Sequence, residues 1–490
     1  MKDKKKKQNF CMLLCALILL TGVSCTSGET TETPPTTDTV ETEKKANITD
    51  QKFSGEDFNV IYMTGGSYGM GNEVDYSFEE TGTTSVSFAV YDRNMFTEEH
   101  LDITINGTFV DPAGGAFNPH VMNLVQSGDS TYDTICSYLM NNYELVTQNA
   151  LLNLRELDSI HLDNPWWDKG INENFTFFGS KQFFATGDIC IDDDCTVEVM
   201  YFSKKLHDEN NVAYPYDDVR NGVWTIDKLV QNMEIAVTDL NGDGQMDNED
   251  IFGMSASIGI IPAMMVYLGA PSTVIDEEGC PQFAYSYHPE KMVNTFDVIY
   301  DALIVNPAVR FIELDMNSDY AGSDAMFCSN QLMYRSGAIG SLQGMRDKMD
   351  DGFGIIPFPK LNEEQENYIS NGSMCASTYA IPVTAENPEH TAAILDVMGY
   401  YSVDTITETV IQDVVMIRNT RDEISEEMLR FAIANKTYDI GTSLKLASYT
   451  QEMYKTIDRN SKIFVSTMES IQPKFEADVA TLIEVFGGKQ

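Results

Sequence analysis

The sequence predicts an α/β protein with mainly parallel sheets, arranged as two lobes. Candidate strands and helices alternate along the chain, which is typical of βαβ units. From residue 56 onward the chain has about 430 residues, more than a single hydrophobic core usually covers, so two lobes are expected. No repeat of fixed period occurs, which argues against a solenoid or a propeller.

Three segments in the first third of the chain are predicted to be β-strands. Residues 58–62 form a buried apolar run, residues 101–105 alternate apolar and polar side chains, and residues 132–137 form a third candidate. Ligands of parallel sheets usually bind beyond the carboxyl ends of the strands, in the cleft between lobes. We therefore expect a functional site near the ends of these strands.

Helices are predicted between and after the strands. Residues 91–99 link the first two strands, a second helix begins with Thr225 as its N-cap, and a third opens with Asn387 and Pro388. Near the C-terminus an apolar pattern predicts helices packed on the body, with a break at Pro473 because proline cannot donate the helical hydrogen bond. The apolar face of the second helix consists of Ile226, Leu229, Val230, Met233 and Val237.

Residues 1–25 have the layout of a secretory signal peptide. Five lysines precede the apolar segment 10–20, which is shorter than the ~20 residues that a membrane span needs. Cys25 follows small residues and precedes a Thr/Glu/Ser/Pro tract, which resembles the lipobox of bacterial lipoproteins, where such a cysteine is acylated. Gly22 stands where the usual lipobox has leucine. An ordinary cleaved signal and an uncleaved anchor helix are the alternatives.

Residues 26–55 are predicted to be a disordered tether. The segment is rich in Thr, Glu, Ser and Pro, and it has too few large apolar side chains to offset the entropy of ordering. With acylation at Cys25, these features predict a protein that is lipid-anchored to the cell membrane on its extracellular face.

The chain is strongly acidic, with 32 basic and 75 acidic side chains and a formal net charge of −43. Such a surface repels nucleic acids and anionic lipids, so polyanions are excluded as expected partners. We interpret the charge as an aid to solubility beside a negatively charged cell surface. Attraction of a cationic substrate is the alternative.

Six cysteines lie beyond residue 25, and six cysteines allow fifteen pairings. The close pair Cys190 and Cys195 could clip a hairpin if oxidised, whereas buried thiols are an equally good interpretation for a chain that is long enough to form a core. The remaining four are Cys136, Cys280, Cys328 and Cys375.

An acidic loop at residues 239–250 predicts a structural calcium site. Oxygen donors at positions 1, 3, 5, 9 and 12, with Gly244 at position 6, suit a hard cation and the sharp bend that it needs. Asp at position 12 is shorter than Glu, so the loop is closer to the dockerin type than to a full EF-hand. An acidic turn without metal is the alternative. The predicted ligands are Asp239, Asn241, Asp243, Gln245 through its backbone carbonyl, Asp247 and Asp250.

Several stretches, taken in order, resemble the extracellular solute-binding proteins (family 1, carbohydrate type) that serve bacterial ABC importers as lipoproteins. The most specific is Asn-Gly-Val-Trp-Thr-Ile-Asp-Lys-Leu at 221–229, followed by the acidic loop. The resemblance covers roughly residues 56–490. The other stretches are 150–154, 164–168, 181–188, 197–206, 352–360 and 379–383.

This resemblance implies a two-lobed periplasmic-binding-protein-like fold of type II, as in maltose-binding proteins, with a hinge between the lobes. It places residues 56–186 and 337–400 in an N-terminal lobe and residues 187–336 and 401–490 in a C-terminal lobe, with crossings near 186–188, near 335–337 and after the Asn387 helix. It also implies a function. The lobes close on a solute, most favourably a sugar or oligosaccharide, and a monomeric receptor delivers it unchanged to the ABC permease.

A sugar pocket needs flat aromatic faces and fixed polar groups, and six residues at strand ends or at the implied hinges are candidates for these roles. For each of them a structural role is the alternative: Tyr62 in the core, Tyr138 packing a loop, or Arg335 pairing with Asp188. The candidates are Tyr62, Thr64, Tyr138, Asn141, Asp188 and Arg335.

The three tryptophans are predicted to pack in the core rather than to form a stacking platform. Trp166 and Trp167 precede a candidate helix, and Trp224 begins another.

Enzymatic function is not expected. The six histidines are scattered without metal-ligand spacing, and neither a G-x-S-x-G elbow nor a P-loop occurs. A secreted glycoside hydrolase, or another carbohydrate-active surface protein, is the alternative, because the separation of paired carboxylates is set by the fold and not by the sequence. A surface assembly protein is a weaker alternative, since the calcium-type loop occurs once and in mid-chain.

Overall fold

The computed structural model describes residues 48–63, 84–110, 115–342, 345, 348–349, 352–417, 420–421 and 423–487. All of them belong to one compact unit, Asn47–Gln490. The predicted signal peptide, the acylation site Cys25, most of the predicted tether and Thr64 lie outside the described residues, and they stay predictions.

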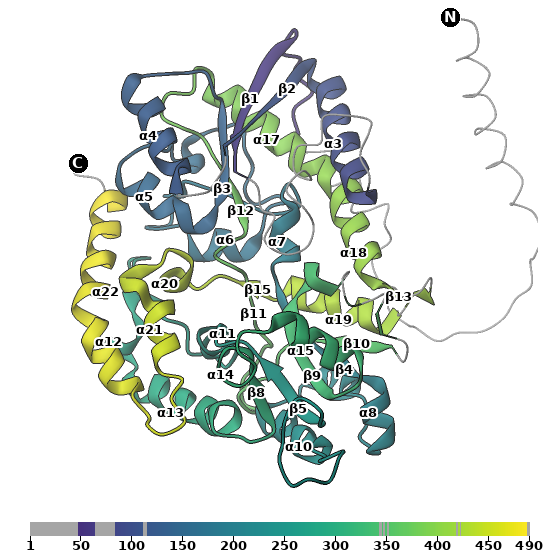
Figure 1. The fold of residues 1–490 in the computed structure, drawn as a ribbon. Helices are drawn as coiled ribbons and strands as arrows, with labels where there is room; N and C mark the ends of the chain where they lie inside the picture. The colour runs from purple at the N-terminus through teal and green to yellow at the C-terminus, as the bar shows by residue number, and fades with distance from the viewer. Residues whose placement is uncertain are drawn as a thin grey trace, which may run out of the picture. The chain divides into compact units, whose positions relative to one another are not determined.

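Four strands form the first sheet, in the order β12-β3-β1-β2 (Figure 1). β1 pairs in parallel with both β2 and β3, whereas β12 pairs antiparallel with β3. The three predicted strands are confirmed, although β2 begins two residues later than expected because helix α3 (Ser85–Leu101) continues to Leu101. The strands are β1 (Glu56–Tyr62), β2 (Ile103–Phe109), β3 (Thr134–Tyr138) and β12 (Ser377–Ala380).

Five strands form the second sheet, in the order β10-β4-β9-β5-β8. β5 pairs in parallel with β8 and β9, and β4 runs antiparallel to β9 and β10. The α/β prediction is confirmed, and mainly parallel pairing holds for the first sheet, whereas the second sheet is mixed, with two parallel and two antiparallel pairings. The strands are β4 (Glu198–Ser203), β5 (Phe252–Ala256), β8 (Val309–Phe311), β9 (Leu332–Ala338) and β10 (Phe353–Ile356).

Strand pairing moves one boundary of the predicted lobes. β10 pairs with β4 and so belongs to the second sheet, although the family resemblance places residues 337–400 in the first lobe. The chain returns to the first sheet only at β12, so this crossing lies between residues 356 and 377 rather than near 335–337. The difference arises because an apolar pattern identifies a strand without revealing its partner.

Alternate residues of the strands enter different hydrophobic cores. Val199 and Tyr201 of β4 pack in one cluster, while Met200 and Phe202 point into another. Successive side chains of a strand point to opposite faces, so this division means that both faces of the sheet are covered. Apolar residues of both sheets meet in the largest of these clusters.

The predicted helices are present. Thr225 and Asn387 occupy the N-cap positions of α10 and α17, and Pro388 opens α17, although neither cap side chain makes a capping hydrogen bond. After α3, the α-helices of the described residues are α4 (Phe117–Ser127), α5 (Asn142–Thr147), α6 (Lys169–Asn174), α7 (Ile191–Cys195), α8 (Lys204–Glu209), α9 (Tyr216–Arg220), α10 (Ile226–Ala236), α11 (Ile260–Tyr267), α12 (Ala284–Tyr287), α13 (Pro289–Ile299), α14 (Ile312–Asp315), α15 (Tyr320–Cys328), α17 (Pro388–Ser402), α18 (Glu408–Val415), α19 (Glu423–Ala434), α20 (Ile440–Ser443), α21 (Tyr449–Lys455) and α22 (Phe464–Gly487). Two π-helical turns, Tyr300–Ile304 and Val403–Thr407, extend α13 and α17. Short strand pairs are β6 (Thr273–Ile275) with β7 (Pro281–Phe283), β11 (Ser370–Asn371) with β15 (Lys436–Thr437), and β13 (Met416–Ile417) with β14 (Thr420–Arg421).

The predicted break at Pro473 is wrong, because α22 continues through it. Ring stacks hold the helix on both sides of the proline. Phe464 stacks on Phe296 at 4.4 Å and Phe475 on Phe283 at 4.2 Å, and Phe486 stacks on Phe177 at 4.1 Å. These buried aromatic contacts offset the missing hydrogen bond, so tertiary packing overrides the local preference.

A buried carboxylate fixes the paired tryptophans. Asp396 of α17 accepts hydrogen bonds of 2.8 Å from the indole nitrogens of both Trp166 and Trp167, and its other oxygen lies 2.9 Å from His161 Nδ1. Burial raises the pKa of Asp396, and the hydrogen bonds from His161, Trp167 and Trp166 oppose that rise. Both tryptophans are buried, as is Trp224, so the prediction that all three pack in the core is confirmed.

The six described cysteines are not joined in disulfides. Cys190 and Cys195 lie at the two ends of α7 and not in a hairpin. Four of the six are buried, which confirms the interpretation of buried thiols over a disulfide framework for these residues. None of the helices formed by the described residues combines the length and the apolar character that a membrane crossing requires.

Asp396→Ala is expected to lower the free energy of unfolding by on the order of 3 kcal/mol, because it leaves two buried indole N–H donors without an acceptor. Urea unfolding followed by tryptophan fluorescence measures the change. Asp163→Ala is the control, since the Asp163 side chain in the same loop is 91% exposed and its removal should cost less than about 0.5 kcal/mol. Equal losses for both variants would contradict the assignment.

Candidate ligand-binding site

A cavity of about 400 Å³ opens at the carboxyl edge of the parallel strands of the second sheet. Ser257 and Ile312 lie directly after β5 and β8, Arg335 to Ala338 end β9, and Glu198 begins the antiparallel β4. This edge is where α/β sheets usually bind ligands. The other lining residues are Thr196, Gly259, Ile260, Pro262, Ala263, Tyr267, Tyr320, Ser341, Asn371, Gly372, Ser373, Met374, Thr442, Thr450 and Tyr454.

The wall formed by residues 371–374 connects the cavity to the first sheet. The backbone N–H of Met140 donates to the carbonyl of Met374 at 3.0 Å, and that of Leu139 donates to Ala376 at 2.9 Å. Leu139 and Met140 directly follow β3, so the cavity borders the strand ends of both sheets. Helices α20 and α21 contribute three further polar side chains of the lining, Thr442, Thr450 and Tyr454.

Three tyrosines give the cavity flat faces and neutral hydroxyl groups. Tyr267 is buried and stacks on Phe358 at a centroid distance of 4.1 Å. Tyr320 is 48% exposed and donates a short hydrogen bond to Glu313, and burial raises the pKa of Tyr320 to about 12. Burial, with the nearby charges of Glu198 and Glu313, also raises the pKa of Tyr454. All three phenols therefore stay protonated near neutral pH and can donate hydrogen bonds.

Two charged side chains, Arg335 and Glu198, are among the described residues of the lining. Arg335 forms an ion pair, whereas Glu198 accepts a hydrogen bond from a neutral phenol. Arg335 is 12% exposed, and its Nη2 lies 2.5 Å from Asp324 Oδ1. Glu198 is partly buried and accepts a hydrogen bond of 3.3 Å from the Tyr267 hydroxyl. Burial raises the pKa of Glu198, whereas the Tyr267 hydrogen bond and the Arg335 charge oppose that rise.

Several buried polar atoms of the lining have no hydrogen-bond partner among the described residues. They are Arg335 Nε, Asn371 Oδ1 and Thr450 Oγ1. A buried polar group without a partner costs about 1–3 kcal/mol, so such groups usually find a ligand or an ordered water. Together they offer one donor, one acceptor and one hydroxyl, contributed by three separate elements, β9, β11 and α21.

A strained turn positions α21 against the cavity. Lys445, Ala447 and Ser448 have φ values of 56°, 48° and 57°, in the left-handed region that non-glycine residues rarely adopt. The turn is anchored from α22, where Asp478 Oδ2 accepts the backbone N–H of Ala447 at 2.7 Å. Such strain persists where surrounding contacts enforce it, and it is concentrated at functional sites.

The structure brings one of the predicted ligand residues, Arg335, to this cavity. Arg335 pairs with Asp324, so its proposed alternative pairing with Asp188 is wrong. Tyr62 is partly buried and lies 5.9 Å from Phe109, ring to ring.

Tyr138, Asn141 and Asp188 lie elsewhere. Tyr138 is buried in the core, and Asn141 Nδ2 lies 2.9 Å from Met63 Sδ. Asp188 accepts a hydrogen bond of 2.6 Å from Thr407 and lines a second cavity of about 310 Å³.

Sequence reasoning missed most residues of the cavity. Glu198 lies in the stretch 197–206 that carried the family resemblance, and four residues separate 371–374 from the stretch 379–383. Polar residues in or near these stretches were the available signal. Tyr267, Tyr320 and Thr450 belong to segments without a motif, and only the fold brings them together.

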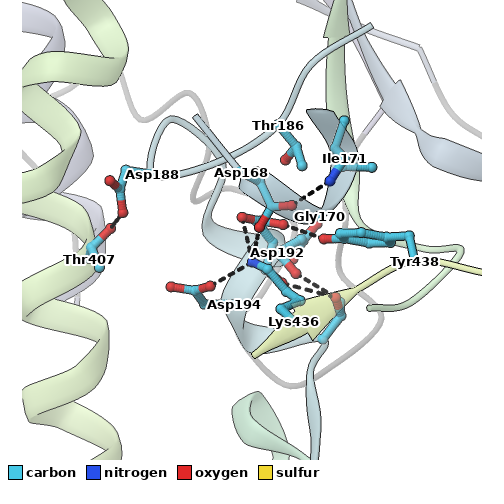
Figure 2. A network of polar contacts seen from close by, with 12 residues as sticks. Asp168, Gly170, Ile171, Thr186, Asp188, Asp192, Asp194, Thr407, Lys436 and Tyr438 are labelled. Carbon is cyan, nitrogen blue, oxygen red and sulfur yellow. Dashed lines mark hydrogen bonds and ion pairs between the residues drawn. The ribbon is translucent and has the colours of Figure 1, made fainter. Parts of the chain in front are cut away.

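A buried lysine ties the elements around the second cavity (Figure 2). Lys436 Nζ of β15 lies 3.1 Å from Asp168 Oδ2, 2.7 Å from Asp193 Oδ2 and 2.8 Å from Asp194 Oδ1. Tyr438 donates a further hydrogen bond to Asp193. Burial raises the pKa of Asp193 to about 8, with Lys436 opposing the rise and Asp168 and Asp194 adding to it. The cluster joins α6, α7 and β15 at the crossings between the sheets.

The predicted calcium loop has oxygen donors, but they face its own backbone. Asp239 accepts the N–H groups of Gly242 at 2.6 Å and Gly244 at 2.9 Å, and Asp250 accepts those of Leu240 and Asp247. Within the described ranges, no group of three or more His, Cys, Asp or Glu side chains is arranged to hold a metal ion. Carboxylate and amide oxygens suit calcium, but in this structure they bond to backbone N–H groups and do not point towards one common centre. Calcium binding therefore stays a prediction.

No family model and no curated protein matches the chain. Solved structures do. The sugar-binding protein MalE from Xanthomonas citri aligns with a TM-score of 0.58 and 10% identity, over 89% of this chain and 100% of the other. UspC from M. tuberculosis aligns with a TM-score of 0.56 and 12% identity, over 86% and 100%.

A third solved structure has the same fold. The galacto-N-biose-/lacto-N-biose I-binding protein of a Bifidobacterium longum ABC transporter, in complex with lacto-N-biose, aligns with a TM-score of 0.54 and 12% identity, over 89% of this chain and 98% of the other. At such identities the likeness concerns the fold. It confirms the predicted two-lobed fold of the maltose-binding type.

Asp193→Asn is expected to flatten the pH dependence of stability. Burial raises the pKa of Asp193 to about 8 in the folded state, whereas the ordinary pKa of an aspartate in the unfolded chain is near 4. Between these two pH values the folded protein holds a proton that the unfolded chain has released. The contribution of Asp193 to the free energy of unfolding therefore falls as the pH rises from about 4 to about 8. The stability of the variant relative to the wild type should therefore rise between about pH 4 and pH 8 and level off above pH 8. Urea unfolding across this range measures the gain. A stability difference between the variant and the wild type that does not change with pH would contradict the prediction. Asp163→Asn is the control, because the Asp163 side chain is exposed and its replacement should leave the pH dependence unchanged.

Proposed function

We propose that this protein is an extracellular receptor that captures a small solute, most favourably a sugar or oligosaccharide, and delivers it unchanged to the permease of an ABC importer. The observation that carries the proposal is the cavity at the strand edge of the second sheet, in which tyrosine rings and unpartnered buried polar atoms lie together. Flat rings suit the C–H faces of a sugar, and scattered donors and acceptors suit its hydroxyl groups.

Each part of the lining has a role in this proposal. Tyr320 and Tyr454 stack on the sugar, and Glu198 accepts hydroxyl protons. Arg335 Nε donates to a ligand oxygen, while Asn371 Oδ1 accepts from a ligand hydroxyl. Binding then satisfies groups that are otherwise buried without partners, which makes capture favourable without covalent chemistry.

Closure of the two lobes around the solute is the proposed signal to the permease. The segments that cross between the sheets are fixed by the Lys436 cluster and by β11 pairing with β15, so the cavity walls can move as units about these crossings. The fold similarity to sugar-binding receptors supports this role.

The cellular context rests on the sequence. Acylation at Cys25, a tether over residues 26–55 and attachment to the extracellular face of the cell membrane follow from the lipobox resemblance and the composition. The receptor is proposed to act as a monomer.

A glycoside hydrolase is the less favoured function. Hydrolysis of a glycosidic bond commonly uses two carboxyl groups on either side of the scissile bond. Among the described residues that line the cavity, Glu198 is the one carboxylate, and the neighbours in fold are binding proteins.

A thermal-shift screen of saccharides, peptides and polyamines tests the proposal. At least one saccharide is expected to raise the melting temperature without being converted, because a ligand at 100 times its Kd stabilises the folded state by about 2.7 kcal/mol. New reducing ends would indicate a hydrolase instead. Stabilisation by peptides or polyamines alone would contradict the sugar assignment.

Tyr320→Ala is expected to weaken binding of the stabilising saccharide by about tenfold, since it removes a stacking face. Isothermal titration calorimetry measures the loss. Tyr287→Ala is the matched control, because Tyr287 is 58% exposed and is not part of the cavity lining. The same loss in both variants would argue against stacking on Tyr320.

Calcium at residues 239–250 is a separate proposal. Addition of about 1 mM calcium to chelator-treated protein is expected to raise the melting temperature, as for weak extracellular calcium loops, while saccharide binding persists without the ion. Asp243→Ala should abolish this response because it removes an exposed oxygen donor. Calcium-independent melting of the wild type would contradict the proposal.

A further inference from the structure

The charge of the cavity is unbalanced towards the negative. Glu198 and Arg335 are the charged side chains among the described residues of its lining. Asp324 lies 2.5 Å from Arg335, and Glu313 accepts hydrogen bonds from Tyr320 and from the N–H of Ile258 at the same edge of the sheet. One carboxylate therefore lines the cavity, and two more contact residues of its lining, Arg335 and Tyr320, whereas the lining has a single guanidinium.

The positive charge of Arg335 is already matched. Besides the ion pair with Asp324, its Nη1 donates a short hydrogen bond to the carbonyl of Ser336. These contacts use two of the five N–H groups of the guanidinium, and Nε is buried without a partner among the described residues. A ligand carboxylate would therefore meet a guanidinium whose charge Asp324 already balances, which weakens its attraction.

Glu198, by contrast, keeps most of its hydrogen-bonding capacity. An ionised carboxylate has about four acceptor sites. Within the described part of the chain, the Glu198 carboxylate accepts one hydrogen bond, the 3.3 Å contact from Tyr267. Its position at the start of β4, in the cavity wall, leaves the other acceptor sites for ligand protons. Hydrogen bonds to an ionised acceptor are also about twice as strong as neutral ones.

We propose that Glu198 is the specificity-determining residue of this cavity, which selects uncharged polyhydroxylated sugars and rejects sugar acids. This inference rests on the proposed function and narrows its ligand class. A neutral sugar donates hydroxyl protons to Glu198. A uronate in the same position brings a second carboxylate with no protons to donate, and two carboxylates that share a site disfavour each other's ionisation.

The groups around Glu198 do not titrate with it near neutral pH. Tyr201, Tyr267 and Tyr454 are the phenols that interact with it, and burial raises the pKa of each. Arg335 is the facing cation, and a guanidinium is not deprotonated in proteins. Burial raises the pKa of Glu198 itself, so discrimination against a uronate should weaken as the pH is lowered and Glu198 gains a proton.

The test compares neutral disaccharides of glucose, galactose and mannose with the matching disaccharides that carry a uronic acid, by calorimetric titration at pH 7 and pH 5. The wild type is expected to bind the best neutral disaccharide at least about tenfold more tightly than its uronate at pH 7. Glu198→Gln should weaken binding of the neutral disaccharide by about tenfold. It should also bring the ratio of the two dissociation constants, uronate over neutral disaccharide, close to one at both pH values. Glu363→Gln, in an exposed loop outside the cavity, should match the wild type.

Each outcome decides between the two proposals. If the wild type binds the uronate as tightly as the neutral disaccharide, or more tightly, the role of Glu198 is overturned but the receptor function stands. The same holds if the ratio of the two dissociation constants is the same in Glu198→Gln as in the wild type. If none of the disaccharides binds, the sugar-receptor function fails and this inference fails with it. Should Glu198→Gln not fold, Glu198→Asp keeps the charge and should keep the discrimination.

Discussion

The buried ammonium group of Lys436 is the constraint on which the arrangement of this protein depends. A buried charge must be paired, and the carboxylates of Asp168 and Asp194, at the start of α6 and in α7, supply the pairing (Figure 2). Asp193 is a further polar neighbour of the ammonium group. Moving one of these elements away would leave the ammonium charge of Lys436 without a partner. The contacts therefore fix the positions of α6, α7 and β15 relative to one another. The neighbouring β11 is paired with β15, and residues 371–374 that follow it form a wall of the cavity.

The cavity shows how a rigid frame supports a polar site. Strands β5, β8 and β9 end together and present Ser257, Ile312 and the Arg335 segment at one edge, while α21 is held on the other side by a strained turn and by Asp478. Packing and hydrogen bonds therefore fix the lining before any ligand arrives. The polar atoms left without partners are the places where a ligand can add favourable contacts.

Aromatic packing explains where local sequence rules fail. Pro473 lies inside α22 because three ring stacks, formed by Phe464, Phe475 and Phe486, hold the helix on both sides of it. The paired tryptophans are buried for a related reason, since Asp396 accepts both indole N–H groups and makes burial possible without an unsatisfied donor. In both cases partners distant in sequence decide the local structure.

The sequence by itself determined the α/β class, the first three strands, the helices after Thr225 and Asn387, and the packing of Trp166, Trp167 and Trp224, because apolar periodicity and capping residues act locally. Of the ligand residues that it predicted, Arg335 lies in β9 and lines the cavity, while its role in binding stays a prediction. Only the tertiary structure decided that β10 pairs with β4 and that Glu198, Tyr267, Tyr320 and Thr450 line one cavity. The physical reason is that strand partners and converging side chains depend on contacts between segments far apart in the chain, which no local pattern encodes.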